Sequence, residues 1–163
     1  MAERTSSSLD KIIPAEVKAD RFYDAIFNIA RSANVQTVLE IGSSAGDGST
    51  DAFVKGLRQN PHHPVLYCME VSEPRHKALA DRYANDHFVK AYRASSVPVS
   101  GFATEEQVTQ FYQTARTNLN QYPLQQVLGW LKDDIGYVNA ENIPRNGIEK
   151  IKLENNIQHF GIC

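Results

Sequence analysis

A loop rich in glycine and serine follows a strand-like run in residues 37–50, whose sequence is TVLEIGSSAGDGST. Glycine has no Cβ, so Gly42, Gly46 and Gly48 would let a ligand approach the main chain closely. Residues 48–57 have the pattern of a helix, and the unpaired N–H groups of its first turn would point at such a ligand. Ligands of open parallel sheets bind beyond the carboxyl ends of the strands. This arrangement suits a dinucleotide or an adenosyl cofactor.

An acid at the end of a second strand-like run could bind the sugar of such a cofactor. Glu70 lies in the segment MEVSEP, and its carboxylate could accept two hydrogen bonds from a ribose diol. Dinucleotide enzymes use the same device, so Glu70 alone does not discriminate. The glycine spacing does, because Ser43-Ser44-Ala45 stands where the G-x-G-x-x-G fingerprint of a pyrophosphate site needs its second glycine. The sequence therefore favours an adenosyl cofactor.

The elements that would position these residues alternate between strand and helix. β-branched runs predict strands over residues 35–41, 65–71 and 87–92, and helical periodicity predicts helices over 15–33, 48–57 and 72–83. In the first helix Phe22, Ile26, Ile29 and Ala30 would form the apolar face, with Pro14 in its first turn. This order predicts an α/β fold with a Rossmann-like parallel sheet and flanking helices.

After residue 100 no strand of comparable strength follows, and three helical stretches are expected at 104–119, 123–132 and 146–157. The sheet would therefore be incomplete, with about three strands. We expect a single domain of 163 residues, with a flexible segment 1–14, a cofactor-binding part 15–98 and a mostly helical part 101–163.

Composition places the chain among ordinary globular proteins, with 42% apolar and 22% charged residues. A net charge of −2 with scattered Lys and Arg gives no sign of nucleic-acid binding, and no apolar run is long enough for a membrane span. The N-terminal residues lack the apolar core of a signal peptide, so we expect a cytoplasmic protein. The two cysteines, Cys68 and Cys163, have no disulfide spacing and fit a reduced compartment.

The segment VLEIGSSAGDGST resembles the first motif of class I S-adenosylmethionine-dependent methyltransferases, and its E-I-G-x-x-x-G form is closest to small-molecule O-methyltransferases of the catechol type. The resemblance continues through YCMEVSEPRHKAL, which is similar to the family's second motif, and reaches a weaker third segment, VKAYRASSVP. It covers roughly residues 15–98. It implies S-adenosyl-L-methionine as the cofactor and a small-molecule acceptor, methylated at oxygen.

The resemblance also implies roles for single residues around the methionine part of the cofactor. Gly42 and Gly46 would permit its approach to the main chain, and Ser44 and Ser49 would offer hydroxyls to its carboxylate or amine. Glu40 belongs to the motif and would orient the loop.

Around the nucleoside, the resemblance implies that Glu70 holds the ribose hydroxyls and that Val71 lies beside the adenine. Ser95 or Ser96 would approach the adenine edge. The plainer alternatives are a simple turn for the glycine loop, a solvated strand end for Glu70, and ordinary loop positions for the two serines.

No catalytic residue and no metal site can be named from the sequence. The adjacent acids Asp133 and Asp134, with Glu141, could attract a metal, but such a pair is more often a solvated helix end. His62 and His63 lack further spaced ligands, so a zinc site is not expected.

The family's acceptor machinery follows a fourth strand that carries an aspartate, and this chain shows none unless residues 157–163 begin it. The first hypothesis is thus a methyltransferase, or a fragment of one. The alternative is a catalytically inactive, truncated methyltransferase-like protein that serves assembly or partner binding, and a nicotinamide-binding domain comes third. The third strand would form an exposed edge, which predicts cover by the late helices or a homodimer through that edge.

Overall fold

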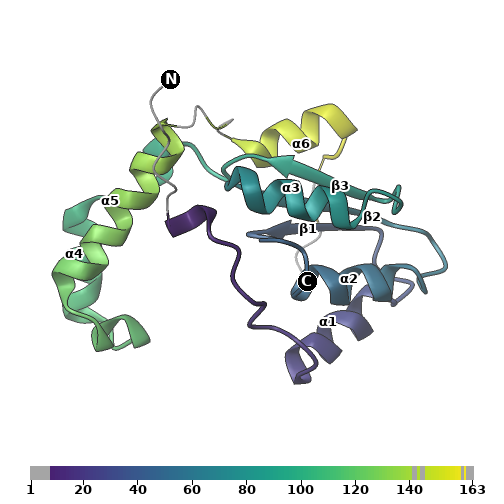
Figure 1. Ribbon diagram of the computed structural model, residues 1–163, viewed down its shortest axis with the longest axis horizontal. Helices are drawn as coiled ribbons and strands as arrows, with labels where there is room; N and C mark the ends of the chain where they lie inside the picture. Colours follow the sequence, from purple (N-terminus) through teal and green to yellow (C-terminus); the bar gives the residue numbers. More distant parts are fainter. Residues whose placement is uncertain (1–7, 141–142, 144–145, 159, 161–163) are drawn as a thin grey trace.

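The computed structural model describes residues 8–140, 143, 146–158 and 160. Its centre is a three-stranded sheet of β1 (Thr37–Ile41), β2 (Val65–Glu70) and β3 (Val89–Arg93) in the order β1-β2-β3. Both pairs of strands are parallel, with Glu40 opposite Cys68 and Glu70 opposite Arg93. The predicted α/β fold with a three-stranded parallel sheet, flanking helices and a helical C-terminal part is confirmed (Figure 1).

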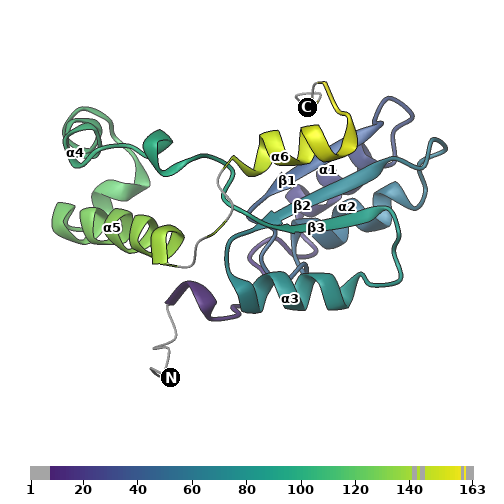
Figure 2. The same ribbon diagram turned by 90° about the horizontal axis from the view of Figure 1, so that it is seen from above.

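Each face of the sheet carries its own apolar cluster, because successive side chains of β2 point to opposite faces. Leu66 and Cys68 are fully buried in the first cluster, which is formed with α1 (Arg21–Ala30), α2 (Ser49–Leu57) and α3 (Glu73–Arg82). Tyr67 and Met69 contribute to the second cluster, which contains Ile151 of α6 (Gly147–Asn155). Figure 2 shows α3 and α6 on opposite sides of the strands.

A helical arm projects from the sheet part of the molecule (Figure 1). It comprises α4 (Glu105–Thr114), the 3-10 helix η3 (Asn118–Gln121) and α5 (Leu124–Ala140), and it follows the short η2 (Val99–Gly101). Thr104 and Gln107 begin α4 with a reciprocal capping box. The helix predicted over 123–132 corresponds to α5 and is longer than expected. The last turns of α5 bring Tyr137 and Val138 into a buried cluster with Ile143.

The helix predicted over residues 15–33 is wrong over its first six residues, 15–20. α1 begins only at Arg21, because the Asp20 carboxylate caps it by accepting a hydrogen bond from the Tyr23 N–H at 2.7 Å. Ala19, with φ +52°, breaks any helix before that cap. Two members of the expected apolar face are exposed, Phe22 (61%) and Ile29 (48%).

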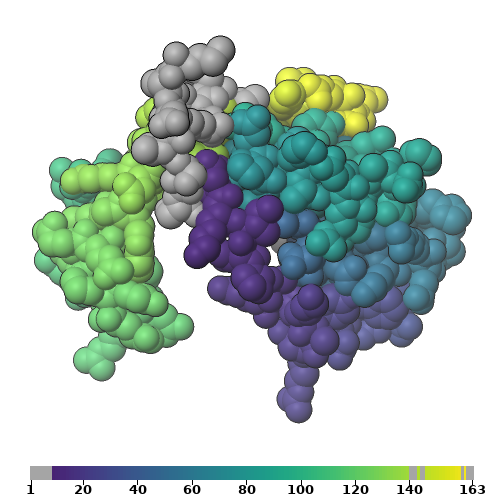
Figure 3. All heavy atoms as spheres, in the orientation of Figure 1, coloured from purple at the N-terminus to yellow at the C-terminus, as the bar shows by residue number. Residues whose placement is uncertain are grey.

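Residues 8–18, here called the strap, form η1 (Ser8–Asp10) and then a non-helical segment. Pro14 therefore lies outside any helix. The strap lies on the surface between the helical arm and the sheet part (Figure 3). It contacts residues of α3 and α5, as described below, and the predicted flexibility of residues 1–14 stays a prediction.

The end of the chain does not extend the sheet within the described residues. Ile157 and Phe160 pack on the apolar cluster around Tyr67 and Met69, and neither lies in a strand. Residues 159 and 161–163 of the predicted fourth strand lie outside the described residues, as do Cys163 and Glu141. Within the residues that the structure describes, β1 and β3 are the two edge strands of the sheet. Among the helices that the structure describes, none has the length and apolar character needed to cross a membrane.

Candidate functional site

The glycine loop crosses the carboxyl end of the central strand. The main-chain N–H groups of Gly42 and Ser43 both donate to the carbonyl oxygen of Met69, at 2.9 and 3.1 Å. Three loop residues have left-handed backbone angles: Gly42 (φ +81°), Ser44 (φ +49°) and Gly46 (φ +79°). Residues with a Cβ rarely adopt this backbone region, so the loop depends on the glycines at positions 42 and 46.

The two glycines have different surroundings. A Cβ on Gly42 would meet no atom within 4 Å, so the main chain there faces open space. A Cβ on Gly46 would lie 2.7 Å from Leu79 Cδ1 and 2.8 Å from Tyr83 Cε2. Gly46 is therefore required by the close approach of the loop to α3 and its C-cap, a role that the sequence did not reveal.

The back of the loop is fastened to α3. The Tyr83 hydroxyl donates to the carbonyl oxygen of Gly46 at 2.5 Å, and Arg82 Nε donates to the carbonyl of Ala45 at 3.1 Å. Burial raises the pKa of Tyr83, so the phenol stays a donor over the physiological range.

Glu70 holds the loop from the other side. Its Oε2 accepts a hydrogen bond from the Ser44 N–H at 2.8 Å, and its Oε1 accepts one from the Ser72 N–H at 2.8 Å. The residue is only 5% exposed. A carboxylate has about four acceptor positions, so each oxygen keeps one for a ligand hydroxyl. Glu70 can therefore shape the loop and bind a ligand together.

Glu40 has a different position, although it also ends a strand region. Its two oxygens accept hydrogen bonds from the hydroxyls of Ser49 (2.5 Å) and Thr50 (2.6 Å), in the first turn of α2. Glu40 is 7% exposed and fastens the start of α2 to β1. The Ser49 hydroxyl therefore donates to Glu40 rather than toward a ligand.

Two cavities share Gly42 in their linings. The first, here called the sheet-end cavity, has a volume of about 250 Å³ and is lined by Glu70, Val71 and Ser95 of the predicted site. The second, the loop cavity, measures about 270 Å³ and is lined by Ser44 and Ser49. The structure thus brings six of the eight predicted site residues into the linings of these two cavities, while Glu40 and Gly46 line neither.

The serines after β3 also lie at this site. Ser95 and Ser96 both line the sheet-end cavity, and Ser95 is only 3% exposed. The Ser95 hydroxyl donates to the carbonyl oxygen of Val97 at 2.8 Å. Its lone pairs remain available as acceptors.

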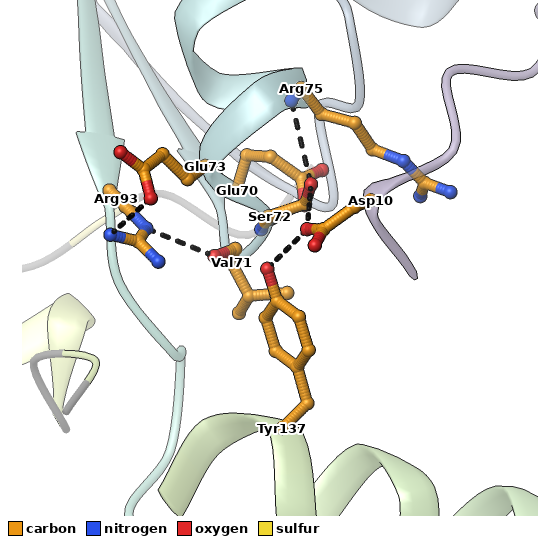
Figure 4. A network of polar contacts seen from close by, with 8 residues as sticks. All are labelled: Asp10, Glu70, Val71, Ser72, Glu73, Arg75, Arg93 and Tyr137. Carbon is orange, nitrogen blue, oxygen red and sulfur yellow. Dashed lines mark hydrogen bonds and ion pairs between the residues drawn. The ribbon is translucent and has the colours of Figure 1, made fainter. Parts of the chain in front are cut away.

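The strap contributes to the lining of both cavities. Leu9 lines the sheet-end cavity, and residues 13–17 line the loop cavity. Asp10 Oδ1 accepts hydrogen bonds from the Ser72 hydroxyl (3.1 Å) and the Tyr137 hydroxyl (2.5 Å), as Figure 4 shows. Arg75 Nε and Nη2 donate to the carbonyl of Lys11 at 3.0 and 2.7 Å. The strap is therefore joined to α3 and α5 next to Glu70.

We expect Tyr137→Phe to lower the free energy of unfolding by about 1–3 kcal/mol, because Tyr137 is 7% exposed and its hydroxyl bonds a carboxylate. Urea denaturation measures the change. Tyr122→Phe is the matched control, since Tyr122 is 44% exposed, and it should change stability by less than about 0.5 kcal/mol. Equal effects of the two substitutions would contradict the assigned role of the Asp10–Tyr137 contact.

The same contact has a pH signature. Burial, and then the hydrogen bond to Asp10, raise the pKa of Tyr137 above its ordinary value. A raised pKa means that the stabilisation is present below about pH 10 and is lost as the pH rises through the higher folded-state pKa. The stability difference between wild type and Tyr137→Phe should therefore shrink in alkaline solution.

The lining of the two cavities is acidic. Glu70 and Asp134 line the sheet-end cavity, while Glu16 and Asp47 line the loop cavity with the single guanidinium of Arg75. Burial, and then the charge of Asp133, raise the pKa of Asp134. This charge balance disfavours a polyanionic ligand and favours a cationic or neutral one.

Sequence analysis did not identify two residues that lie at this candidate site, Asp134 and Asp10. Asp134 is exposed, which agrees with the expectation of a solvated acid pair, and it also lines the sheet-end cavity. The spacing of Asp134, Tyr137 and Val138 places the three on one face of α5, which is the signal that could have identified it. Asp10 had no comparable signal. Within the described residues, no group of three or more His, Cys, Asp or Glu side chains could hold a metal ion.

The arrangement places two cavities beside Gly42, with the Glu70 carboxylate in the lining of one of them. Comparison with known proteins adds no assignment: no family model matches this chain, and a search of curated proteins found no match.

Proposed function

We propose that this chain binds S-adenosyl-L-methionine in the two cavities that share Gly42 and serves methyl transfer to an oxygen of a small-molecule acceptor, either alone or as part of a longer methyltransferase. The observation that carries the proposal is the position of Glu70. Its carboxylate lines the sheet-end cavity and bonds the Ser44 N–H of the glycine loop. A single side chain thus joins the place for a sugar to the loop that would hold the rest of the cofactor.

The nucleoside would occupy the sheet-end cavity. Glu70 would accept hydrogen bonds from the ribose hydroxyls, and Val71 would lie against the base, with Ser95 or Ser96 at its edge. The apolar residues Ile41, Met69, Phe102 and Val138 complete a lining suited to a planar ring.

The methionine part would pass over Gly42 into the loop cavity. A Cβ on Gly42 would meet no protein atom, so the space that a ligand needs is present there. Ser44 and Asp47 line this cavity, and the Asp47 carboxylate suits the amino group of the ligand. The resemblance implied a similar role for Ser49, but its hydroxyl donates to Glu40.

The charge of the lining supports a sulfonium cofactor over a dinucleotide. A pyrophosphate would lie near the carboxylates Glu70 and Asp47, whereas the only cationic side chain among the described lining residues is Arg75. Two N–H groups of Arg75 already bond the carbonyl of Lys11. S-adenosyl-L-methionine would supply an electrophilic methyl group on a positively charged sulfur, which the acidic lining favours.

Isothermal titration calorimetry with S-adenosylhomocysteine tests the proposal, with NADH as the comparison ligand. We expect S-adenosylhomocysteine to bind and NADH to bind at least about tenfold more weakly, because its pyrophosphate meets the acidic lining. Absence of S-adenosylhomocysteine binding, to this chain and to a version extended beyond residue 163, would refute the cofactor assignment.

The second candidate function is a catalytically inactive protein whose late helices bind a partner. It is favoured by the helical arm, where no residue of α4 or η3 is buried and where Phe111, Leu119, Tyr122 and Trp130 are each at least 38% exposed. Turnover by the 163-residue chain with phenolic and sugar acceptors would reject this alternative. A homodimer through a sheet edge stays a prediction, and light scattering would test it by measuring the molar mass in solution. A cytoplasmic location also stays a prediction.

A further inference from the structure

The sheet-end cavity has a second carboxylate besides Glu70, that of Asp134, which is exposed to solvent. Asp134 belongs to α5, whereas the cavity residues Val71 and Ser95 follow β2 and β3. A nucleoside whose ribose is bound by Glu70 in this cavity would share the cavity with this residue of α5. Asp134 is the acidic residue that a base would meet there.

The part of α5 that carries Asp134 is held in place by contacts one helical turn further along. Tyr137 donates its hydrogen bond to Asp10. Val138 is buried in a cluster against which Leu9 of the strap and Val71, the residue after β2, pack. Residues three and four apart share a helix face, so the same face of α5 presents Asp134 to the cavity. Its neighbour Asp133 does not line the cavity.

The chemistry of the lining is selective for one type of base edge. A carboxylate accepts hydrogen bonds and cannot donate one when ionised. Among the described lining residues of the sheet-end cavity there is no Lys, Arg or His, so protein cations do not compensate Asp134 there. A ligand that offers an N–H donor would be favoured, and one that offers a carbonyl oxygen would be repelled.

We propose that Asp134 selects the purine base of the bound cofactor by accepting a hydrogen bond from the exocyclic amine of adenine. This inference rests on the proposed function, because it requires a nucleoside in the sheet-end cavity. A 6-oxo purine places an oxygen where adenine has its amine, so two acceptors would face each other. Asp134 is thus a specificity-determining residue from the helical part of the chain, outside the segments that carry the methyltransferase-like motifs.

Calorimetry with two ligands that differ only in the base tests the assignment. Wild type should bind S-adenosylhomocysteine about tenfold to a hundredfold more tightly than S-inosylhomocysteine, the usual range for a hydrogen bond to a charged group. In Asp134→Asn the amide can also donate, so the preference should fall to about threefold or less. Asp133→Asn, the adjacent control, should keep the wild-type preference, and circular dichroism confirms that both variants fold.

The outcomes separate the two levels of the argument. If wild type binds both ligands equally, or if Asp134→Asn keeps the full preference, the role of Asp134 is refuted while cofactor binding stands. If Asp133→Asn loses the preference as well, the selection is not specific to Asp134 and the assignment is again refuted. If neither ligand binds wild type, the proposed function itself fails.

Discussion

Replacement of Gly46 by alanine is expected to lower the free energy of unfolding by about 2–5 kcal/mol. The new methyl group would lie 2.7 Å from Leu79 Cδ1 and 2.8 Å from Tyr83 Cε2, so side chains in a buried cluster must move. Such overpacking costs about 1–3 kcal/mol. The left-handed backbone at φ +79° adds about 1–2 kcal/mol for a residue with a Cβ.

The loop contains its own matched control. Gly42 has nearly the same backbone angle, φ +81°, but an added Cβ would meet no atom within 4 Å. Gly42→Ala should therefore cost only the backbone part, about 1–2 kcal/mol. Urea denaturation of both variants isolates the packing cost as their difference. Equal losses would show that the contact of the loop with Leu79 and Tyr83 is not as tight as described.

Ligand binding should separate the same two variants in the opposite sense. The methyl group of Gly42→Ala would be added at the residue that lines both cavities, so S-adenosylhomocysteine binding should weaken. Gly46 lines neither cavity, so Gly46→Ala, measured at a temperature where it is folded, should bind more nearly like wild type.

The sheet and the position of its loop could be predicted because their signals are local. Short β-branched runs such as Val65–Glu70 specify strands, and the glycines mark where β1 ends. Parallel strands place their carboxyl ends at one edge, so Glu70 and the glycine loop had to meet there. The hydrogen bond from the Ser44 N–H to Glu70 follows from that topology.

The strap could not be predicted, because its contacts are not local. Asp10 and Tyr137 are 127 residues apart in the chain, and neither segment carries a pattern that identifies the other. The apolar and helical periodicity of residues 15–33 even favoured a longer helix, which the Asp20 cap prevents. The role of Gly46 could not be predicted either. A glycine that is required by packing and a glycine that leaves room for a ligand look alike in a sequence.

Glu70→Gln is expected to lower the affinity for S-adenosylhomocysteine by about tenfold to a hundredfold and the free energy of unfolding by about 1–3 kcal/mol. Both oxygens of Glu70 accept hydrogen bonds from main-chain N–H groups, those of Ser44 and Ser72. An amide offers one oxygen and one NH₂ group, and a main-chain N–H cannot become an acceptor. One buried donor would therefore lose its partner and face another donor, and the loop would lose its support.

Glu40→Gln is the control that makes this argument specific. Glu40 is as deeply buried, but its partners are the Cys68 thiol at 3.7 Å and the hydroxyls of Ser49 and Thr50. Hydroxyl groups can rotate and accept as well as donate. The amide can thus be satisfied, so the loss in stability should be smaller, below about 1 kcal/mol. Because Glu40 lines neither cavity, the affinity of the Glu40→Gln variant for S-adenosylhomocysteine should stay close to that of wild type. Calorimetry and urea denaturation measure both quantities, and an equal loss of affinity in the two variants would show that Glu70 has no direct part in binding.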